Sequence, residues 1–281
     1  MKKLLTALTC LTLAIIVSAT FIGCKKNTDS GLAIGNECMA YNSQLDALNR
    51  LNEKTVDAAV IDSVMAGYYT NNGALKGKLA VKDFNLETEQ YGIAAKKGND
   101  ALISKINDAL IALADGEYSA IAEKYGLASE KLITASTAND KSGANDASWQ
   151  NIVNKKKVVI GYTLFAPIAY DDNGLVGFDI DLAKAVFAYL NADITCEFQL
   201  IKWDQKENML ETGTIDLVWN GLTITDERLS EMSVSLPYLR NKQVVVVRAE
   251  DSDKYTDVAS LKNAVIGVES GSAGESAVKG N

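Results

Sequence analysis

Histidine is missing from all 281 residues of this chain, and proline occurs only twice. Without imidazole, Ser-His and Cys-His catalysis and histidine-based metal sites are excluded, and we expect neither a metal ion nor a cofactor. Positive charge is also scarce, because 28 Lys and Arg stand against 36 Asp and Glu, for a net charge of −8. A nucleic-acid-binding protein needs a basic surface, so this balance argues against a nucleic-acid partner.

Composition otherwise indicates an ordinary globular protein. Hydrophobic residues make up 47% and charged residues 23% of the chain. The length allows one or two domains with a sizeable core.

Residues 1–23 have the pattern of a signal peptide. Lys2-Lys3 is a charged start, and an apolar run follows from Leu4 to Ile22. Such a run could also be a membrane-spanning helix, but Thr, Ser and Ala interrupt it and small Gly23 follows it. The pattern favours a cleaved signal.

The segment Phe21-Ile22-Gly23-Cys24 resembles a bacterial lipobox, although Leu is more usual where Phe21 stands. The resemblance implies cleavage before Cys24 and attachment of lipid to its thiol. Residues 24–30 would then be a tether, and the protein would lie on the outer face of the bacterial cytoplasmic membrane. A plain signal anchor is the alternative.

Two further cysteines, Cys38 and Cys196, remain in the chain beyond Cys24. They could form one disulfide outside the cytoplasm. Both lie in predicted strands far apart in the chain, which favours two buried free thiols.

Strand and helix patterns alternate after the tether, and this predicts an α/β fold with mostly parallel sheets. Predicted strands cover 39–41, 56–61, 78–81, 91–95, 157–161, 195–201, 215–218, 244–247 and 265–268. Predicted helices cover 44–51, 63–69, 100–113, 179–190 and 205–210, with one more ending at Tyr125. Residues 129–148 are rich in Ala, Ser, Thr, Asn, Asp and Gly, a composition typical of a flexible linker.

One stretch, Trp219 to Arg228, has the pattern of a binding device for a small anion. A strand delivers a Gly and two Thr to a turn, and Arg228 follows at a spacing that lets its guanidinium return over that turn. A carboxylate needs such a planar fork and a few more donors. Taken alone, the stretch could equally be an ordinary strand, turn and helix with a surface Arg.

The chain resembles the amino-acid-type, family 3 extracytoplasmic solute-binding proteins, the receptors of ABC importers, with its two halves in reversed order. Marks of the family's first half are Gly161, Pro167, Gly174, Gly177-Phe178-Asp179-Ile180-Asp181, Gly221-Leu222-Thr223-Ile224-Thr225 with Arg228, Pro237-Tyr238 and Gly271-Ser272. Marks of its second half are Val56-Asp57-Ala58 with Asp62, Glu89 to Ala94 with Lys97-Gly98-Asn99, Asp115 to Tyr118, and Lys124-Tyr125-Gly126.

The resemblance implies a two-lobed α/β fold of the periplasmic-binding-protein-like type II, circularly permuted. The expected parts are 31–97 (second part of lobe 2), 98–128 (C-terminal helices of lobe 1), 129–148 (linker), 149–240 (lobe 1) and 241–281 (hinge strand and first part of lobe 2). A truncated or rearranged gene is an alternative, and a domain-swapped dimer is another.

The resemblance also implies a site for a zwitterionic amino acid. Arg228 would clamp the carboxylate, Asp62 would accept the ammonium, and Phe165 and Trp203 would line the side-chain pocket. Further donors would come from Thr223, the backbone around Gly221, Ser272 and the Ala273 N–H. For Asp62 the alternative is a helix N-cap, since a helix begins at Ser63; for Phe165 and Trp203 it is core packing.

The expected function is capture of an L-amino acid and delivery to an ABC transporter permease, with no catalysis. A neutral polar ligand is expected, because the sequence places no acidic group beyond Asp62 and no second Arg to meet a ligand side chain. The alternative is an enzyme of the dehydratase kind acting on cyclic carboxylates, which some relatives of this fold are.

Overall fold

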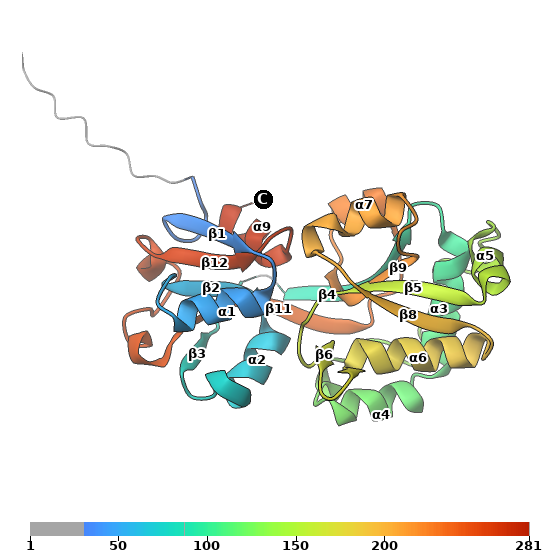
Figure 1. The fold of residues 1–281 in the computed structure, drawn as a ribbon, viewed down its shortest axis with the longest axis horizontal. Coiled ribbons are helices and arrows are strands. Elements are labelled where there is room, and N and C mark those ends of the chain that lie inside the picture. Colours follow the sequence, from blue (N-terminus) through green and yellow to red (C-terminus); the bar gives the residue numbers. More distant parts are fainter. Residues whose placement is uncertain (1–30, 87, 281) are drawn as a thin grey trace, which may run out of the picture.

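The computed structural model describes residues 31–86 and 88–280. The predicted signal peptide, the tether and Cys24 lie outside these residues. Two α/β lobes stand side by side, joined by strands β4 (Thr88–Lys96) and β11 (Leu239–Arg248) (Figure 1). The predicted two-lobed α/β fold is confirmed.

Lobe 2 contains segments from both ends of the described chain. Its sheet has the order β1 (Glu37–Tyr41), β12 (Val265–Glu269), β2 (Ala58–Asp62), β11 and β3 (Leu79–Lys82). The strands β1, β12 and β2 are parallel, whereas β11 is antiparallel to β2 and to β3. Every residue of β2, Ala-Ala-Val-Ile-Asp, is buried, as expected for a central strand covered on both faces. The helices of this lobe are α1 (Gln44–Asn52), α2 (Ser63–Asn71) and α9 (Ala273–Lys279).

Lobe 1 has a sheet in the order β11, β4, β9 (Leu217–Thr223), β5 (Lys157–Tyr162) and β8 (Thr195–Leu200), with β10 (Met232–Val234) paired to β4. A turn at residues 172–174 joins the two strands of the hairpin β6 (Tyr170–Asp171) and β7 (Leu175–Val176). The helices are α3 (Asp100–Ala112), α4 (Glu117–Lys124), α5 (Ser148–Lys155), α6 (Phe178–Leu190), α7 (Lys206–Glu211) and α8 (Asp226–Glu231). Short 3-10 helices occupy Gly73–Leu75, Ala128–Glu130, Trp203–Gln205, Ala249–Asp251 and Ala259–Leu261.

Strand β11 passes from one sheet into the other. Residues 239–242 pair with β4 in lobe 1, and Gln243 to Arg248 pair with β2 and β3 in lobe 2. The four valines 244–247 are buried in the lobe 2 sheet. This crossing places the polar side chains of Asn241 and Gln243 at the joint between the lobes.

The segment predicted to be a flexible linker packs against lobe 1. Asn139 donates to the carbonyl oxygen of Ser104 at 3.0 Å and to Asp108 Oδ1 at 2.8 Å. Asp146 accepts from the N–H of Ala101 in the first turn of α3 at 2.7 Å. The composition was therefore misleading on flexibility, because its Asn and Asp side chains bond the backbone and helix α3 instead of staying solvated.

Three smaller observations concern single residues and the membrane. Cys38 and Cys196 are free thiols, as predicted, but both are half-buried and not buried, and Trp219 is fully buried in the core. Over 31–86 and 88–280, the helices are all too short or too polar to cross a bilayer.

Candidate functional site

The eight residues predicted to bind a ligand all line one cavity between the lobes. Lobe 1 contributes Phe165, Trp203, Gly221, Thr223 and Arg228, and lobe 2 contributes Asp62, Ser272 and Ala273. Gln44, Thr163, Asn220 and Glu269 complete the lining. The space inside is only about 10 Å³, room for about one water molecule.

Arg228 lies at the seam between the lobes. It sits in the first turn of α8, where its N–H donates to the Thr225 hydroxyl that caps the helix. Its Nη1 donates to the carbonyl oxygen of Thr223 at 2.7 Å, and its Nη2 to that of Gly271, in lobe 2, at 3.2 Å. The side chain is buried, and a guanidinium has five N–H donors, so three remain for a ligand.

Asp62 terminates β2 and stands before α2, yet its side chain caps nothing. It accepts from Tyr91 Oη at 2.7 Å, from Gln243 Nε2 at 3.1 Å, and from the side-chain amides of Gln44 and Asn241. The alternative of a side-chain N-cap is therefore wrong. Burial raises the pKa of Asp62, and these donors oppose that rise.

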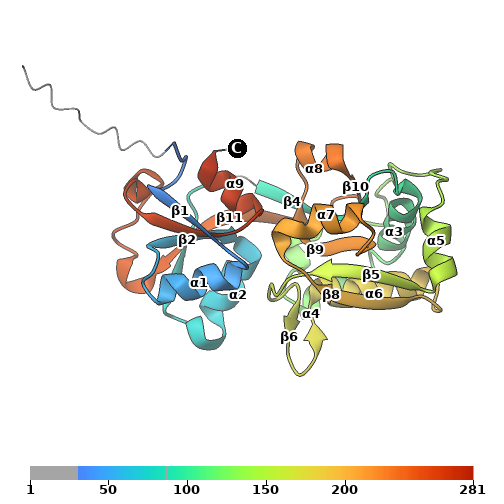
Figure 2. The same ribbon diagram turned by 45° about the horizontal axis from the view of Figure 1, so that its top comes forward.

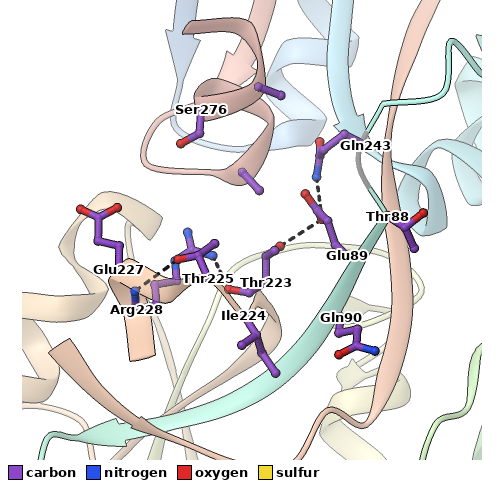
Figure 3. Close-up of a pocket in the computed structure, with 12 residues that line it drawn as sticks. Thr88, Glu89, Gln90, Thr223, Ile224, Thr225, Glu227, Arg228, Gln243 and Ser276 are labelled. Atoms are coloured by element: carbon purple, nitrogen blue, oxygen red, sulfur yellow. Dashed lines mark hydrogen bonds between the residues drawn. The ribbon is translucent and has the colours of Figure 1, made fainter. Parts of the chain in front are cut away.

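Glu89 belongs to the same hydrogen-bond network as Asp62, and the sequence did not predict it as a ligand-binding residue. Its Oε2 accepts from Thr223 Oγ1 at 3.1 Å and from Gln243 Nε2 at 3.1 Å (Figure 3), and also from Asn241 Nδ2 at 3.0 Å. The two amides thus bridge Glu89 and Asp62. Burial, and next the charge of Asp62, raise the pKa of Glu89 to about 7. Because the Thr223 hydroxyl donates to Glu89, it offers a ligand its lone pairs and not its hydrogen.

Position 221 of the cavity wall requires glycine, because a side chain there would collide with Phe165. Gly221 donates from its N–H to Asp179 Oδ2 at 2.9 Å, and this N–H is therefore already paired. Its φ is +63°, and a Cβ here would lie 2.8 Å from Phe165 Cε1. Only glycine combines that backbone angle with so close a neighbour, and Phe165 therefore reaches the cavity beside Tyr91, with their ring centroids 6.4 Å apart.

The turn before α9 brings lobe 2 against lobe 1. Ser272 caps α9, its hydroxyl accepting from the Glu275 N–H at 3.1 Å, and Ala273 is the first helical residue. Lys206 donates from Nζ to the carbonyl oxygens of Trp203 and Gly271, each at 3.2 Å. Trp203 is held under the Lys206 ammonium, 4.9 Å from its ring centroid.

Glu269 is the second acidic residue that the sequence interpretation missed. It ends β12 and lines the cavity with 4% of its surface exposed. The expectation of a neutral ligand depended on Asp62 being the only acidic group placed to meet one, and this premise is wrong. The signal available in the sequence was a Glu directly before the Ser270-Gly271-Ser272 turn.

A larger outer groove adjoins the cavity through Thr223, Arg228 and Ala273. Residues of β4, α8 and α9 are among those that line it (Figure 3), and in Figure 2 helix α8 lies on lobe 1 and helix α9 on lobe 2. Its volume is about 380 Å³. Glu89 and Glu227 are among its lining residues. Acidic groups therefore surround Arg228 on both sides, while the described residues contain no cluster of His, Cys, Asp and Glu that could hold a metal.

A family model matches residues 158–272 of this chain; its description is "Bacterial extracellular solute-binding proteins, family 3". Over 100 residues the chain is 38% identical to "ABC transporter arginine-binding protein 1" of Escherichia coli K12, covering 36% of this chain and 39% of that protein. Over 116 residues it is 38% identical to "Probable histidine-binding protein" of Neisseria gonorrhoeae, covering 41% of this chain and 42% of that protein.

Among solved structures, the chain matches a histidine-bound substrate-binding protein of an ABC uptake transporter from Streptococcus pneumoniae. The identity is 43%, the TM-score is 0.28, and the match covers 30% of this chain and 34% of that one. The chain thus spans well under half the length of the curated relatives described above.

Proposed function

We propose that this chain, which belongs through residues 158–272 to the bacterial extracellular solute-binding proteins of family 3, captures an L-amino acid between its lobes. The observation that carries the proposal is the shared cavity of Arg228 and Asp62, which come from opposite lobes. A zwitterion needs one cation for its carboxylate and one anion for its ammonium, because an unpaired buried charge costs several kcal/mol.

Each charged group has capacity left for a ligand. The Arg228 guanidinium has three further N–H donors for the ligand carboxylate, and Ser272 can donate from its hydroxyl to the same group. Oδ1 of Asp62 accepts three hydrogen bonds and Oδ2 accepts one, from Gln44, so the ammonium would approach Oδ2. Phe165 and Trp203 would enclose the ligand side chain.

Binding requires the lobes to separate. A cavity of about 10 Å³ is too small for any amino acid, and Arg228 and Lys206 both bond Gly271 across the seam. The ligand would enter an open form, and closure would follow because Asp62 and Ser272 of lobe 2 meet the ligand only in the closed form. Micromolar affinity corresponds to about −8 kcal/mol, within reach of two charge pairs and an enclosed side chain.

The relatives named for arginine and histidine binding support a role as the receptor of an ABC importer. In this role the closed protein would dock on a permease. We further propose that Cys24 carries a lipid and holds the receptor on the outer face of the cytoplasmic membrane; the support is the segment Phe21 to Cys24 alone.

The order of the two halves is proposed to be permuted relative to the family. The family match begins at residue 158, whereas residues 31–86, which precede it, pair with β12 and β11 to build lobe 2. A rearranged chain with residues 31–126 placed after Asn281 should keep the same ligand preference. If only one of the two chains binds, the permutation proposal fails.

The proposal is tested by isothermal titration calorimetry of the purified chain against the twenty L-amino acids. Binding of one or a few of them with one-to-one stoichiometry supports it. A folded chain that binds none of them at millimolar concentration overturns it.

The dehydratase alternative rests on the position of Glu269, a buried carboxyl group that lines the cavity. Glu269, whose pKa burial raises to about 8, could hold a proton in the cavity at neutral pH, as a general acid must. Turnover of prephenate or arogenate would favour that enzyme over a transport receptor, and binding of an amino acid without turnover would favour the receptor.

A further inference from the structure

Glu269 has a carboxylate oxygen with no hydrogen-bond partner. Its Oε1 is buried and bonds no atom of the described residues, although the side chain lines the central cavity. Buried polar atoms in folded proteins are almost always paired. An unpaired carboxylate oxygen facing a cavity is therefore a position where a ligand atom can donate.

The cations near Glu269 do not neutralise it. The charge of Lys206 lowers the pKa of Glu269, but the Lys206 ammonium donates to two carbonyl oxygens and pairs with Glu207 Oε1 at 2.8 Å. Arg228 bonds the carbonyl oxygens of Thr223 and Gly271. Neither cation forms an ion pair with Glu269 in 31–86 and 88–280.

The charges that line the cavity are thus unequal. Asp62 and Glu269 are acidic, and Arg228 is the single basic residue among the lining groups. A zwitterionic amino acid would use Arg228 for its carboxylate and Asp62 for its ammonium, and would leave Glu269 without an oppositely charged partner. A ligand with one additional positive charge would satisfy all three.

We propose that Glu269 is a specificity-determining residue that pairs with a positively charged ligand side chain, so that the preferred ligand is a cationic amino acid of the arginine, lysine or ornithine kind. This inference rests on the proposed function, since it concerns the same cavity. The acidic lining of the adjoining outer groove, with Glu89 and Glu227, would favour entry of the same ligands.

Protonation of Glu269 is consistent with this role. Burial, and next the charge of Asp62, raise the pKa of Glu269 to about 8, whereas Gln44 and the charge of Lys206 act to lower it. The carboxyl group is thus neutral much of the time until a cation arrives. Binding of a cationic ligand near neutral pH should then release a proton.

The test compares ligands that differ only in charge. The purified chain is titrated with arginine and with citrulline, which has a neutral urea group in place of the guanidinium, and with lysine and norleucine. In whichever pair contains the preferred ligand, we expect arginine to bind about 10- to 100-fold more tightly than citrulline, or lysine than norleucine. This factor is the range for one charge-assisted hydrogen bond.

The variant Glu269→Gln should weaken cation binding by about the same factor and change citrulline or norleucine binding less than about threefold. Glu197→Gln is the matched control, since Glu197 lies on β8 in a surface pair with Lys157 and carries the same change of charge. If Glu269→Gln fails to fold, the arginine-to-citrulline ratio of the unaltered chain still decides.

Equal binding within each pair, tighter binding of glutamine than of any cation, or an equal loss of both ligands in Glu269→Gln would overturn the inference and leave the proposed function standing. Binding of no amino acid at all would instead remove the proposed function.

Discussion

Arg228 on lobe 1 donates a hydrogen bond of 3.2 Å from Nη2 to the carbonyl oxygen of Gly271 on lobe 2. Its Nη1 at the same time holds the Thr223 carbonyl oxygen of its own lobe at 2.7 Å. One guanidinium therefore lies where the ligand carboxylate is proposed to bind and where the two lobes touch. Contact with a ligand and contact between the lobes are consequently coupled through a single group.

Substituting Arg228→Ala should weaken amino-acid binding by at least about 100-fold, because the ligand carboxylate loses its charged partner. The fold should survive, since the guanidinium bonds only backbone carbonyl oxygens that water can reach once the side chain is gone. Calorimetry and thermal melts measure both effects. Arg240→Ala is the control, because the Arg240 side chain is half exposed and forms only a long surface ion pair of 3.9 Å, with Glu130. Unchanged affinity in Arg228→Ala would exclude the carboxylate role.

Gly221→Ala should destabilise the chain by about 1–3 kcal/mol, the usual cost of overpacking, and should also weaken binding. The added Cβ would lie 2.8 Å from Phe165 Cε1 at a φ of +63°, so both strain and a clash arise. Gly213→Ala separates the two effects, because Gly213 has a φ of +70° and no atom within 4 Å of an added Cβ. Denaturant unfolding compares the variants, and equal losses of stability would mean that the clash with Phe165 is relieved without cost.

Much of the fold followed from local patterns in the sequence. The Ala-Ala-Val-Ile run of β2 and the four valines of β11 predicted strands, and both lie buried in the lobe 2 sheet. The eight candidate residues were placed by motif resemblance, and they line one cavity.

The missed features depend on contacts between distant segments. Glu89 lies in one family mark and Glu269 close to another, but only the folded chain brings Glu89 against Thr223, Asn241 and Gln243 and places Glu269 in the cavity wall. The partner of the Gly221 N–H, Asp179, is 42 residues away on α6, so the local sequence could not show that this donor is already paired. Asn and Asp in residues 129–148 resembled a solvated linker, because composition cannot show that their bonding partners lie on α3.

Cys24→Ala should release the protein from the membrane fraction of cells that express it. Removal of the thiol removes the proposed lipid attachment, and the described residues contain no helix that could span a bilayer. Fractionation followed by immunoblotting measures the change, with Cys38→Ala as control because Cys38 lies in strand β1. Retention of Cys24→Ala in membranes would point to a plain signal anchor.

The free energy of unfolding should fall as the pH rises from about 5 to about 8. Because the chain has no histidine, this fall can be assigned to carboxyl groups. Burial raises the pKa of Asp179 and of Glu89 to about 7, and that of Glu269 to about 8. These carboxyl groups bind protons in the folded state that the unfolded chain has already released, so unfolding becomes easier with each step upward in pH until the folded pKa is passed. No imidazole titrates in this interval to mask the effect.

Melting curves from pH 5 to 8.5 should show a decline of several degrees, given about 2–4 °C for each kcal/mol in a chain of this size. In Glu269→Gln the decline should end nearer pH 7, since the remaining groups have finished titrating there. The charged groups that act on Glu269 are Asp62, Asp46 and Lys206, and Glu197 is not one of them. Glu197→Gln, an equal change of charge at the surface, should therefore leave the decline in melting temperature unaltered. A melting temperature that rises between pH 5 and 8 would show that these carboxyl groups are ionised and paired in the folded protein.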